Sequence, residues 1–481
     1  MSSRRTAAVL VVLLALVFGR ASAAQETEAA GFGAEGFSLA NGLQVVVIPN
    51  HPAPVVTQMV WYKVGAADEP RGKSGIAHFL EHLMFRGSRD VAPGEFSRLV
   101  AQNGGRDNAF TAEDYTAFHQ TVAVDRLPLV MKLEADRMQN LVISDAVVLP
   151  EREVIIEERR SRIDNSPAAL LNEQVRTAIF LNHPYRIPTI GWKHEMAQLS
   201  TQDALDHYRA WYAPNNAVLI VAGDTTAAAV RPLAEQYYGV IPSRPVPPRQ
   251  RLAEPPHVAS ARLELRSPRV AQANWTRSYL APSYTGGEST QAYALEVLAQ
   301  IIGAGATSRL HRTLVVEQKI AQTAGAFYDP GSLDLTNFGL YAVPRADIAI
   351  GDLERAVEAE TRKLLAEGVT SQEVERAKSR MIAEAVYARD SLGGPANIFG
   401  AALATGRSIA DVEAWPARIG AVTAAAVNAA ARFVMHEDTA VTGVLLPDPT
   451  GAAEAASAPA IPVLPGANQP LHLVDPSAET E

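Results

Sequence analysis

A proline-rich stretch near the middle of the 481-residue chain divides it into two parts of similar length. It carries prolines at positions 242, 245, 247, 248, 255 and 256. Proline fixes its own φ angle and donates no backbone hydrogen bond, so this density of proline resists helix and strand alike. A chain of this length is too long for one ordinary core, and two domains of about 200 residues are expected. We therefore predict domains over residues 36–241 and 261–447, joined by a linker over residues 242–260.

The two parts begin with a similar pattern of residues. Residues 37–62 and residues 261–281 each read as strands, and each is followed by helical and then further strand patterns. Strands mixed with longer helical stretches favour the α+β class. We predict an α+β fold of two homologous domains, each a mostly antiparallel sheet packed with helices.

A short apolar segment of the first part carries three ionisable side chains. Residues 77–85 read Ala-His-Phe-Leu-Glu-His-Leu-Met-Phe, between glycines at positions 75 and 87, which predicts a short buried helix. Helix positions i and i+4 share a face, so His78 and His82 can direct ring nitrogens at one point beside Glu81. Two histidines can also simply fill a core, but Glu81 would then be a buried carboxylate without a partner. The spacing therefore indicates an open zinc site that needs one more ligand from elsewhere.

A strongly charged helix is predicted to begin at Pro150, which suits the first helical position. Glu151 and Glu158 lie two turns apart and share a face, with residues 154 and 155 between them. Glu157 lies about 100° away around the helix and is expected to face solvent. The residue types alone leave two interpretations open, a solvated helix with ion pairs or the source of a third metal ligand.

Together these segments resemble the pitrilysin/insulinase family of zinc metallopeptidases, also called inverzincins. The resemblance rests on the His-Phe-Leu-Glu-His run and on the Glu-Arg-x₅-Glu frame that ends at Glu158. It extends over roughly residues 36–446 and is strongest to the bacterial two-domain branch, which is similar to the beta-type subunits of mitochondrial processing peptidase. The resemblance implies one zinc ion per chain, held by His78, His82 and Glu158. It also implies Glu81 as the general base and Glu151 as a supporting residue that does not bind the metal.

A candidate for substrate binding follows the glycines at positions 104 and 105. Residues 106–111 read as a strand that follows a turn. In the family that this chain resembles, the Asn-Ala-x-Thr segment lies on an edge strand beside the zinc and pairs with the substrate backbone. The expected substrate-binding residues are thus Asn108, Ala109 and Phe110, although Asn108 alone is also typical of a turn. His119 is interpreted as a strand residue with no metal role.

The second part lacks two residues that the resemblance leads us to expect. Active peptidases of the family use an Arg and a Tyr, seven residues apart, and Val315 and Gln322 occupy those positions here. Losing a donor to the oxyanion costs ~10²–10³ in kcat. The resemblance therefore implies the zinc subunit of a heterodimer that cleaves peptides or unfolded polypeptides, with a homologous partner supplying Arg and Tyr. The equivalent of the zinc helix, around residues 289–302, has no histidine, so only the first part is expected to bind metal.

Two alternatives stay open. One is a self-sufficient peptidase, homodimeric or monomeric, in which other groups replace the Arg and the Tyr. The other is a non-catalytic, zinc-containing subunit for peptide binding or assembly, against which the presence of Glu81 argues.

The ends and the composition of the chain indicate its location and exclude some sites and partners. Residues 1–23 combine two arginines, a short apolar run and Ala-Ser-Ala, which predicts a secretory signal peptide and a periplasmic protein without a stable membrane anchor. Residues 448–481 are rich in Ala and Pro and predict a disordered tail. The chain has no cysteine, which excludes disulfides and thiolate metal sites. A net charge of −9 without a basic cluster argues against nucleic acid as a partner.

Overall fold

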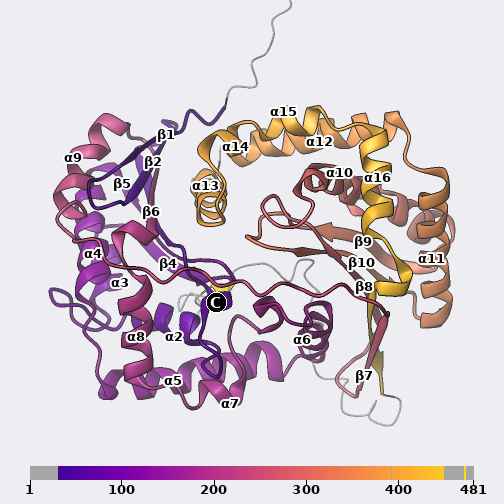
Figure 1. Ribbon diagram of the computed structural model, residues 1–481, viewed down its shortest axis with the longest axis horizontal. Helices are drawn as coiled ribbons and strands as arrows, with labels where there is room; N and C mark the ends of the chain where they lie inside the picture. The colour runs from indigo at the N-terminus through magenta and orange to yellow at the C-terminus, as the bar shows by residue number, and fades with distance from the viewer. Residues whose placement is uncertain (1–30, 390, 392, 449–470, 473–481) are drawn as a thin grey trace, which may run out of the picture.

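A computed structural model describes residues 31–389, 391, 393–448 and 471–472 (Figure 1). The predicted signal peptide, and all but three residues of the predicted disordered tail, lie outside the described residues. Within the part of the chain that is described, no helix combines the length and the apolar character needed to cross a membrane.

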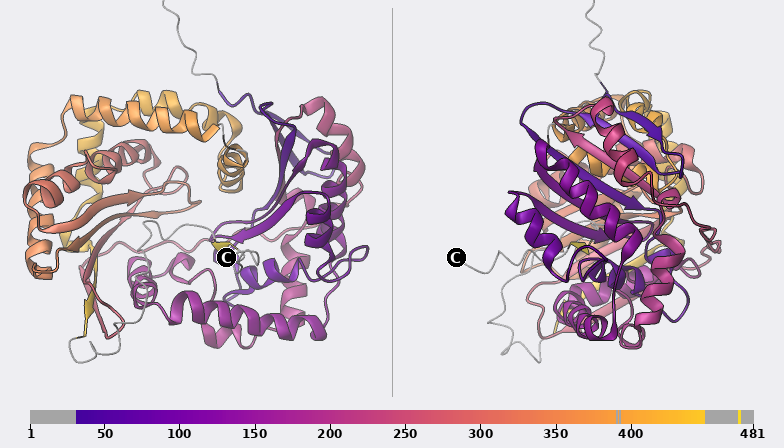
Figure 2. Two further views of the ribbon diagram at one scale, coloured as in Figure 1. Left: turned by 180° about the vertical axis from the view of Figure 1, so that it is seen from behind. Right: turned by 90° about the vertical axis from the view of Figure 1, so that its left-hand side faces the viewer.

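Two sheets, each covered by helices, form the body of the molecule (Figures 1 and 2). The strands of the first sheet are β1 (Glu35–Ser38), β2 (Gln44–Pro49), β3 (Val55–Tyr62), β4 (Arg106–Thr111), β5 (Thr116–Ala123), β6 (Ala217–Gly223) and β12 (Leu471–His472). The strands of the second sheet are β7 (Ala261–Ser267), β8 (Asn274–Ala281), β9 (Ala321–Tyr328), β10 (Thr336–Pro344) and β11 (Val441–Pro447).

The helices divide between the two halves in the same way. The main helices of the first half are α2 (Ile76–Leu83), α3 (Glu95–Gln102), α4 (Leu127–Asn140), α5 (Asp145–Arg159), α6 (Pro167–Ile179), α7 (Lys193–Met196), α8 (Thr201–Trp211) and α9 (Ala227–Tyr237). Those of the second half are α10 (Ala292–Gly303), α11 (Ile350–Glu367), α12 (Ser371–Arg389), α13 (Gly394–Ala404), α14 (Ile409–Glu413), α15 (Trp415–Gly420) and α16 (Ala424–Val434).

The two sheets share one topology. The first has the order β1-β2-β6-β3-β5-β4-β12 and the second the order β7-β11-β8-β10-β9. In each sheet one pair of strands is parallel, β2 with β6 and β7 with β11, and the other pairs are antiparallel. Strands β7, β11, β8, β10 and β9 therefore correspond to β2, β6, β3, β5 and β4. The predicted α+β class, with two homologous and mostly antiparallel sheets, is confirmed.

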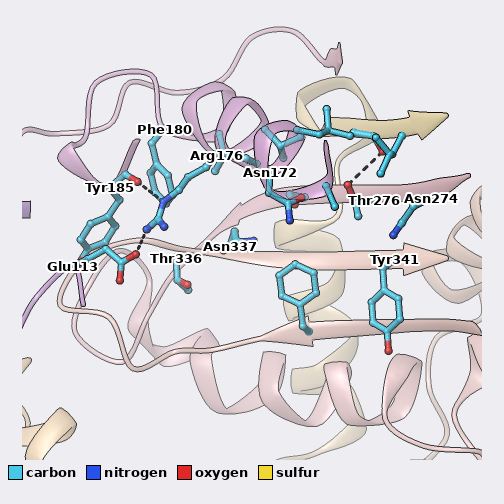
Figure 3. A pocket seen from close by; sticks show the side chains of 18 of the residues that line it. Glu113, Asn172, Arg176, Phe180, Tyr185, Asn274, Thr276, Thr336, Asn337 and Tyr341 are labelled. Atoms are coloured by element: carbon cyan, nitrogen blue, oxygen red, sulfur yellow. Dashed lines mark hydrogen bonds and ion pairs between the residues drawn. The ribbon is translucent and has the colours of Figure 1, made fainter. Parts of the chain in front are cut away.

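Each half has its own core, but two helices are exchanged between the halves. Helix α13 of the second half packs on the first sheet, where Phe399 lies in one apolar cluster with Trp61 of β3. Helix α6 of the first half packs on the second sheet, where Val175 lies in one cluster with Leu445 of β11 (Figure 3). The α13 contact is close, because a Cβ added to Gly400 would lie 1.9 Å from Cε2 of Trp61. The exchange therefore ties each half to the core of the other.

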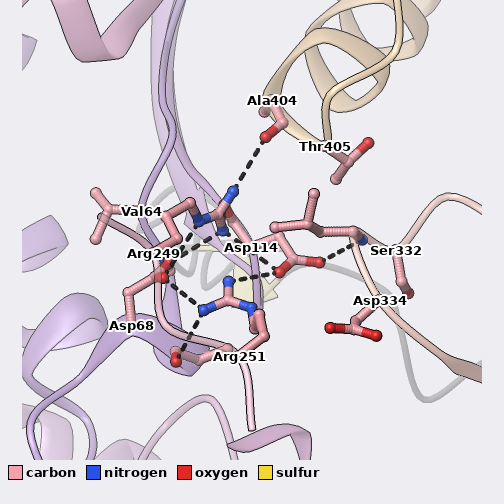
Figure 4. Close-up of polar contacts among 12 residues, drawn as sticks. Val64, Asp68, Asp114, Arg249, Arg251, Ser332, Asp334, Ala404 and Thr405 are labelled. Atoms are coloured by element: carbon pink, nitrogen blue, oxygen red, sulfur yellow. Dashed lines mark hydrogen bonds and ion pairs between the residues drawn. The ribbon is translucent and has the colours of Figure 1, made fainter. Parts of the chain in front are cut away.

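The proline-rich segment between the halves has no helix or strand, yet it is firmly attached (Figure 4). The guanidinium groups of Arg249 and Arg251 lie 3.0 and 2.6 Å from the buried carboxylate of Asp68. Arg251 also lies 3.0 Å from Asp114, in the turn between β4 and β5. Arg249 donates to the carbonyl of Ala404, at the end of α13, over 3.2 Å. The segment thus joins the two halves through buried charges as well as through its backbone.

Candidate metal centre

Helix α2 carries the site, and its start is fixed by a carboxylate. Two backbone N–H groups at its beginning, those of Gly75 and Ala77, donate to Glu69 over 2.9 Å. These donors have no partner within the helix, so the carboxylate supplies what the helix end lacks. Gly75 adopts φ +87°, and a Cβ there would lie 2.5 Å from the carbonyl oxygen of Ile190. Every residue from Ile76 to Leu83 is buried, so the helix is held on all sides.

Two histidines of α2 and one glutamate of α5 converge. Nε2 of His78 lies 3.5 Å from Oε2 of Glu158, and Nε2 of His82 lies 3.3 Å from the same oxygen. One ligand atom from each of the three side chains lies within 4.8 Å of the other two. Within the described residues, no other group of three His, Asp or Glu side chains converges in this way.

Helix α5 begins earlier than the sequence suggests. It starts at Asp145 and continues through Pro150, instead of beginning at that proline. The proline removes one backbone hydrogen bond near the helix N-terminus, and the remaining turns carry the helix onward. The face of α5 that carries Glu151 and Glu158 includes the buried residue Ile155. Val154 is 47% exposed, contrary to the expectation that residues 154 and 155 both lie on that face. Glu157 is exposed.

Glu151 lies behind the histidines and holds one of them. Its Oε1 is 2.8 Å from Nδ1 of His82, and its Oε2 is 2.7 Å from Nε of Arg86. Burial raises the pKa of the Glu151 carboxyl, but the contacts with His82 and Arg86 outweigh this effect and lower it. A carboxylate that binds the far nitrogen of a ligand histidine fixes the ring's tautomer and orientation. Glu151 therefore turns Nε2 of His82 towards Glu158.

The three side chains fit a small divalent cation. Tetrahedral coordination with bonds of 2.0–2.1 Å places ligand atoms about 3.3 Å apart, close to the distances between the histidine nitrogens and Glu158. Nε2 of His82 is buried and has no hydrogen-bond partner. Burial lowers the pKa of His78 to about 3, so that ring is neutral and can bind metal. Two imidazoles and a carboxylate, without thiolate, are a donor set that suits zinc.

Glu81 lies beside this cluster with one oxygen unoccupied. Its Oε2 accepts a hydrogen bond of 2.6 Å from the hydroxyl of Thr111, while its buried Oε1 has no partner. Burial raises the pKa of Glu81 to about 7, against the opposing effects of His82 and of the Thr111 hydrogen bond. A carboxyl group that titrates near neutral pH suits proton transfer in either direction.

Strand β4 brings Thr111 to Glu81, and it is not the edge strand that the sequence led us to expect, because both of its sides are paired. On one side it pairs with β5, and on the other with β12, in which Leu471 lies opposite Thr111 and His472 opposite Phe110. Ala109 belongs to the core that contains α2, whereas the Phe110 ring faces the other way and lies 5.2 Å from that of Trp61.

The remaining expected residues take separate places. Asn108 is half-buried, and its side-chain carbonyl accepts from the backbone of Ala109 over 2.9 Å. His119 lies on β5 and is not a member of the metal cluster. Val315 packs against the second core, and Gln322 is exposed on β9, the edge strand that corresponds to β4. Neither of these two side chains is a guanidinium or a phenol.

Two residues of the site were missed by the sequence analysis as functional candidates, Thr111 and Arg86. The alternation of β4 could have indicated Thr111, because residues 109 and 111 of a strand face the same side. Arg86 lies four residues after His82, beyond the last turn of α2, so its contact with Glu151 depends on tertiary packing.

Two family models match this chain. Residues 44–192 match the family described as Insulinase (Peptidase family M16), and residues 198–381 match the Peptidase M16 inactive domain. The chain is 29% identical over 369 residues to the zinc protease PqqE of Helicobacter pylori, covering 76% of this chain and 82% of that protein.

Two further likenesses concern a subunit and a solved structure. Over 420 residues the chain is 24% identical to a probable mitochondrial-processing peptidase subunit beta of Arabidopsis thaliana, covering 85% of this chain and 77% of that one. The crystal structure of a protease from Helicobacter pylori superimposes with a TM-score of 0.81 at 26% identity, covering 87% of this chain and 100% of that chain.

Proposed function

Because this chain belongs to the insulinase family of peptidases, family M16, we propose that it is a zinc-dependent endopeptidase with Glu81 as its general base. The observation that carries the proposal is the convergence of His78, His82 and Glu158 beside a buried carboxyl group with one free oxygen. A structural zinc site is closed by four protein ligands, whereas three ligands leave a position open for chemistry.

The chain's own residues would divide the work as follows. His78, His82 and Glu158 would hold a zinc ion, which when bound supplies Lewis-acid polarisation of a carbonyl and lowers the pKa of water. Glu81 Oε1 takes the proton of the attacking water, and the same carboxyl later gives a proton to the leaving amine. Thr111 holds the other oxygen, so the free oxygen keeps one orientation through both transfers.

The substrate would bind as an extended strand along β4. Backbone hydrogen bonds to a sheet edge give affinity with little dependence on sequence. The pairing of β12 with Phe110 and Thr111 supports this mode, because an extended segment already lies on that side of β4 and a substrate strand would take its place. The side chain of Phe110 is directed into the contact with α13, so Asn108, Ala109 and Phe110 would act chiefly through their backbone. Peptides and unfolded polypeptides are the substrates that can present such a strand.

We infer a second, homologous subunit. Val315 and Gln322 carry neither the guanidinium nor the phenol of the family's pair, so a partner with the family's Arg and Tyr would complete the site. The 24% identity to a protein named as a subunit supports this arrangement. The signal-like residues 1–23 support a periplasmic location for the pair. The second candidate function is a non-catalytic, zinc-containing subunit for peptide binding, which the match of residues 198–381 to an inactive domain favours.

The test is zinc analysis and cleavage of a quenched oligopeptide library by the purified chain, alone and mixed with its homologue from the same organism. We expect one zinc per chain and cleavage in the mixture that Glu81→Gln abolishes. Cleavage at full rate by this chain alone would overturn the two-subunit arrangement. Stoichiometric zinc without cleavage in either sample would favour the non-catalytic role, and absence of zinc would overturn the metal site.

A further inference from the structure

A cavity of about 300 Å³ lies between α6 and the second sheet (Figure 3), and no side chain of the metal cluster lines it. Helix α6 contacts β7, β8 and β11. Strands β9 and β10, which lie next to β8 in the sheet, form the floor of the cavity. The volume is at the lower end of the range of small-ligand pockets, roughly 300–1,000 Å³. The space is therefore large enough to hold one or two residues of a peptide.

The floor of the cavity is built from two aromatic rings that lie on glycines. Phe327 is paired across the strands with Gly339, and Tyr341 with Gly325. A Cβ on Gly339 would lie 2.0 Å from Cζ of Phe327, and one on Gly325 would lie 2.5 Å from the hydroxyl oxygen of Tyr341. Glycine inside a strand marks such close approaches. The two rings thus lie down against the sheet and offer a broad apolar surface to the cavity.

Polar atoms without partners also line the cavity. Oγ1 of Thr336 is buried and has no hydrogen-bond partner, and the residue is only 2% exposed. Oδ1 of Asn274, from the neighbouring strand β8, is likewise buried and unpaired. The strand register places these two atoms at opposite ends of the cavity, about 20 Å apart. Buried polar groups are normally hydrogen-bonded, so an unpaired atom at each end indicates a ligand with polar groups of its own. A peptide backbone has both the donors and the acceptors that these atoms lack.

The cavity carries no net charge. Its two ionisable lining residues, Arg176 and Glu113, form an ion pair with each other, and Arg176 also donates to the carbonyl of Tyr185. A charged ligand would therefore lose its hydration without gaining an opposite charge. The lining favours an uncharged, apolar or aromatic side chain.

The cavity begins next to the end of the strand proposed to bind substrate. Glu113 lines it and follows Thr111, the last residue of β4, by two residues, or about 7 Å of extended chain. A peptide that lies on β4 in the direction of β12 is antiparallel to it, so its residues on the N-terminal side pass Thr111 towards Glu113. The chain thus runs directly from the strand proposed to bind substrate to the lining of the cavity.

We propose that this cavity is a remote subsite that takes an uncharged, apolar or aromatic residue on the N-terminal side of the cleaved bond. The proposal rests on the peptidase function, because it assigns the occupant as part of the peptide on β4. The occupant is recognised by the rings of Phe327 and Tyr341, and the peptide backbone that leads into the cavity pairs with Thr336, at the end next to Glu113 (Figure 3).

The test is a set of quenched peptides that differ at one position, with Phe, Ala, Asp or Arg placed on the N-terminal or the C-terminal side of the cleaved bond. With the active enzyme, including its homologous partner where cleavage requires it, we expect kcat/KM to fall about tenfold from Phe to Asp on the N-terminal side. The same exchange on the C-terminal side should change kcat/KM little. Equal effects on both sides, or none, would overturn the subsite.

An isosteric variant tests the cavity itself. Asn337→Asp adds a negative charge to the lining and should shift the preference on the N-terminal side from Phe to Arg by about tenfold, with Ala peptides unaffected. Asn172→Asp, on the α6 wall of the same cavity, should act in the same direction and provides a second measurement if Asn337→Asp does not fold. Unchanged preference in a folded variant would overturn the proposal.

Binding separates this proposal from the peptidase function. Fluorescence anisotropy of labelled Phe and Asp peptides with Glu81→Gln protein measures the cavity without turnover. Preference for Phe that Asn337→Asp reverses, in a protein that never cleaves, would keep the subsite and reject the peptidase. Cleavage of peptides without any Phe preference in binding would keep the peptidase and reject the subsite.

Discussion

Helices α2 and α10 occupy equivalent places in the two halves, yet only one of them carries the means of chemistry. Each follows the strand at the centre of its sheet, and each carries a glutamate whose pKa burial raises to about 7, Glu81 and Glu296. Glu296 accepts hydrogen bonds of 2.6 Å from Tyr284 and 3.3 Å from Trp415, so both its oxygens are occupied. Glu81 keeps one oxygen free.

The neighbours of the two glutamates explain the difference further. The residues three before and one after the glutamate are His78 and His82 in α2, but Tyr293 and Val297 in α10. The Tyr293 hydroxyl accepts a hydrogen bond of 2.6 Å from Arg418, so it forms part of a surface contact. The fold thus tolerates a buried carboxyl group in both halves. Only the first half adds two histidines and an unoccupied carboxyl oxygen.

The largest expected effect is the loss of metal binding by the first half. Glu158→Ala removes one of the three proposed ligands, so the purified protein should contain no stoichiometric zinc and should not cleave peptides. Glu157→Ala, on the exposed face of the same helix, is the matched control and should keep both properties. Elemental analysis of the two variants decides, and full zinc in Glu158→Ala would remove this residue from the ligand set.

The second prediction compares the two glutamates directly. Glu81→Gln should keep its zinc and lose ~10²–10⁴ in kcat, because an amide cannot take the proton of water. Glu296→Gln should keep both zinc and kcat, since an amide oxygen can still accept from Tyr284 or Trp415. Steady-state kinetics on one peptide measures both, and equal losses would show that the two carboxyl groups are not distinguished by their surroundings.

The third prediction concerns the support behind the histidines. Glu151→Ala frees Nδ1 of His82 and should weaken zinc affinity or activity by roughly 10–100-fold. Competition with a chelator measures the affinity. Glu153→Ala, exposed on the same helix, serves as the control, and an unchanged affinity in Glu151→Ala would assign that residue to stability alone.

The fourth prediction sharpens the comparison through packing. Gly400→Ala places a methyl group against Trp61 and should destabilise the protein by about 1–3 kcal/mol. Gly420→Ala, at the end of α15, meets no atom within 4 Å and should be neutral or slightly stabilising. Urea unfolding of the two variants gives the difference, and equal stabilities would mean that α13 can move away from the first sheet at little cost.

The last expected effect is a pH dependence of stability from the second half. The folded pKa of Glu296 is about 7 and its ordinary value is 4.5, so the folded state holds the proton more tightly. This stabilisation is complete below about pH 4.5 and is lost as the pH rises to about 7. Glu296→Gln cannot titrate, so its stability relative to the parent protein should rise over that interval and level off above it. Parallel pH profiles of the unfolding free energy would contradict the assignment.

The residues of the metal centre could be predicted from the sequence, whereas most of their surroundings could not. His78, Glu81 and His82 lie in one helical pattern, and the seven-residue spacing of Glu151 and Glu158 puts both on one helix face. Helix periodicity is local, so it can be read from neighbouring residues. The structure brings all five together, whereas their roles in binding and catalysis stay predictions.

Contacts between distant segments could not be predicted in this way. The hydroxyl of Thr111 reaches Glu81 because β4 lies beside α2, across 30 residues of chain. The exchange of α6 and α13 depends on how two sheets face each other, and neither helix carries a signal in sequence that names its sheet. The early start of α5 before Pro150 likewise depends on packing, which overrides the local preference of proline.

The exchange of helices has a consequence for how the molecule is assembled. Strand β6, the last of the central strands of the first sheet to be made, ends at Gly223. Helix α13, which covers the inner face of that sheet, ends only at Ala404. A ribosome that adds ~5–20 residues per second needs roughly 10–40 s to make the intervening stretch of about 180 residues. During that time α13 is not available to cover Trp61 and Phe110. We therefore expect the first half alone to keep this apolar face exposed until α13 is added.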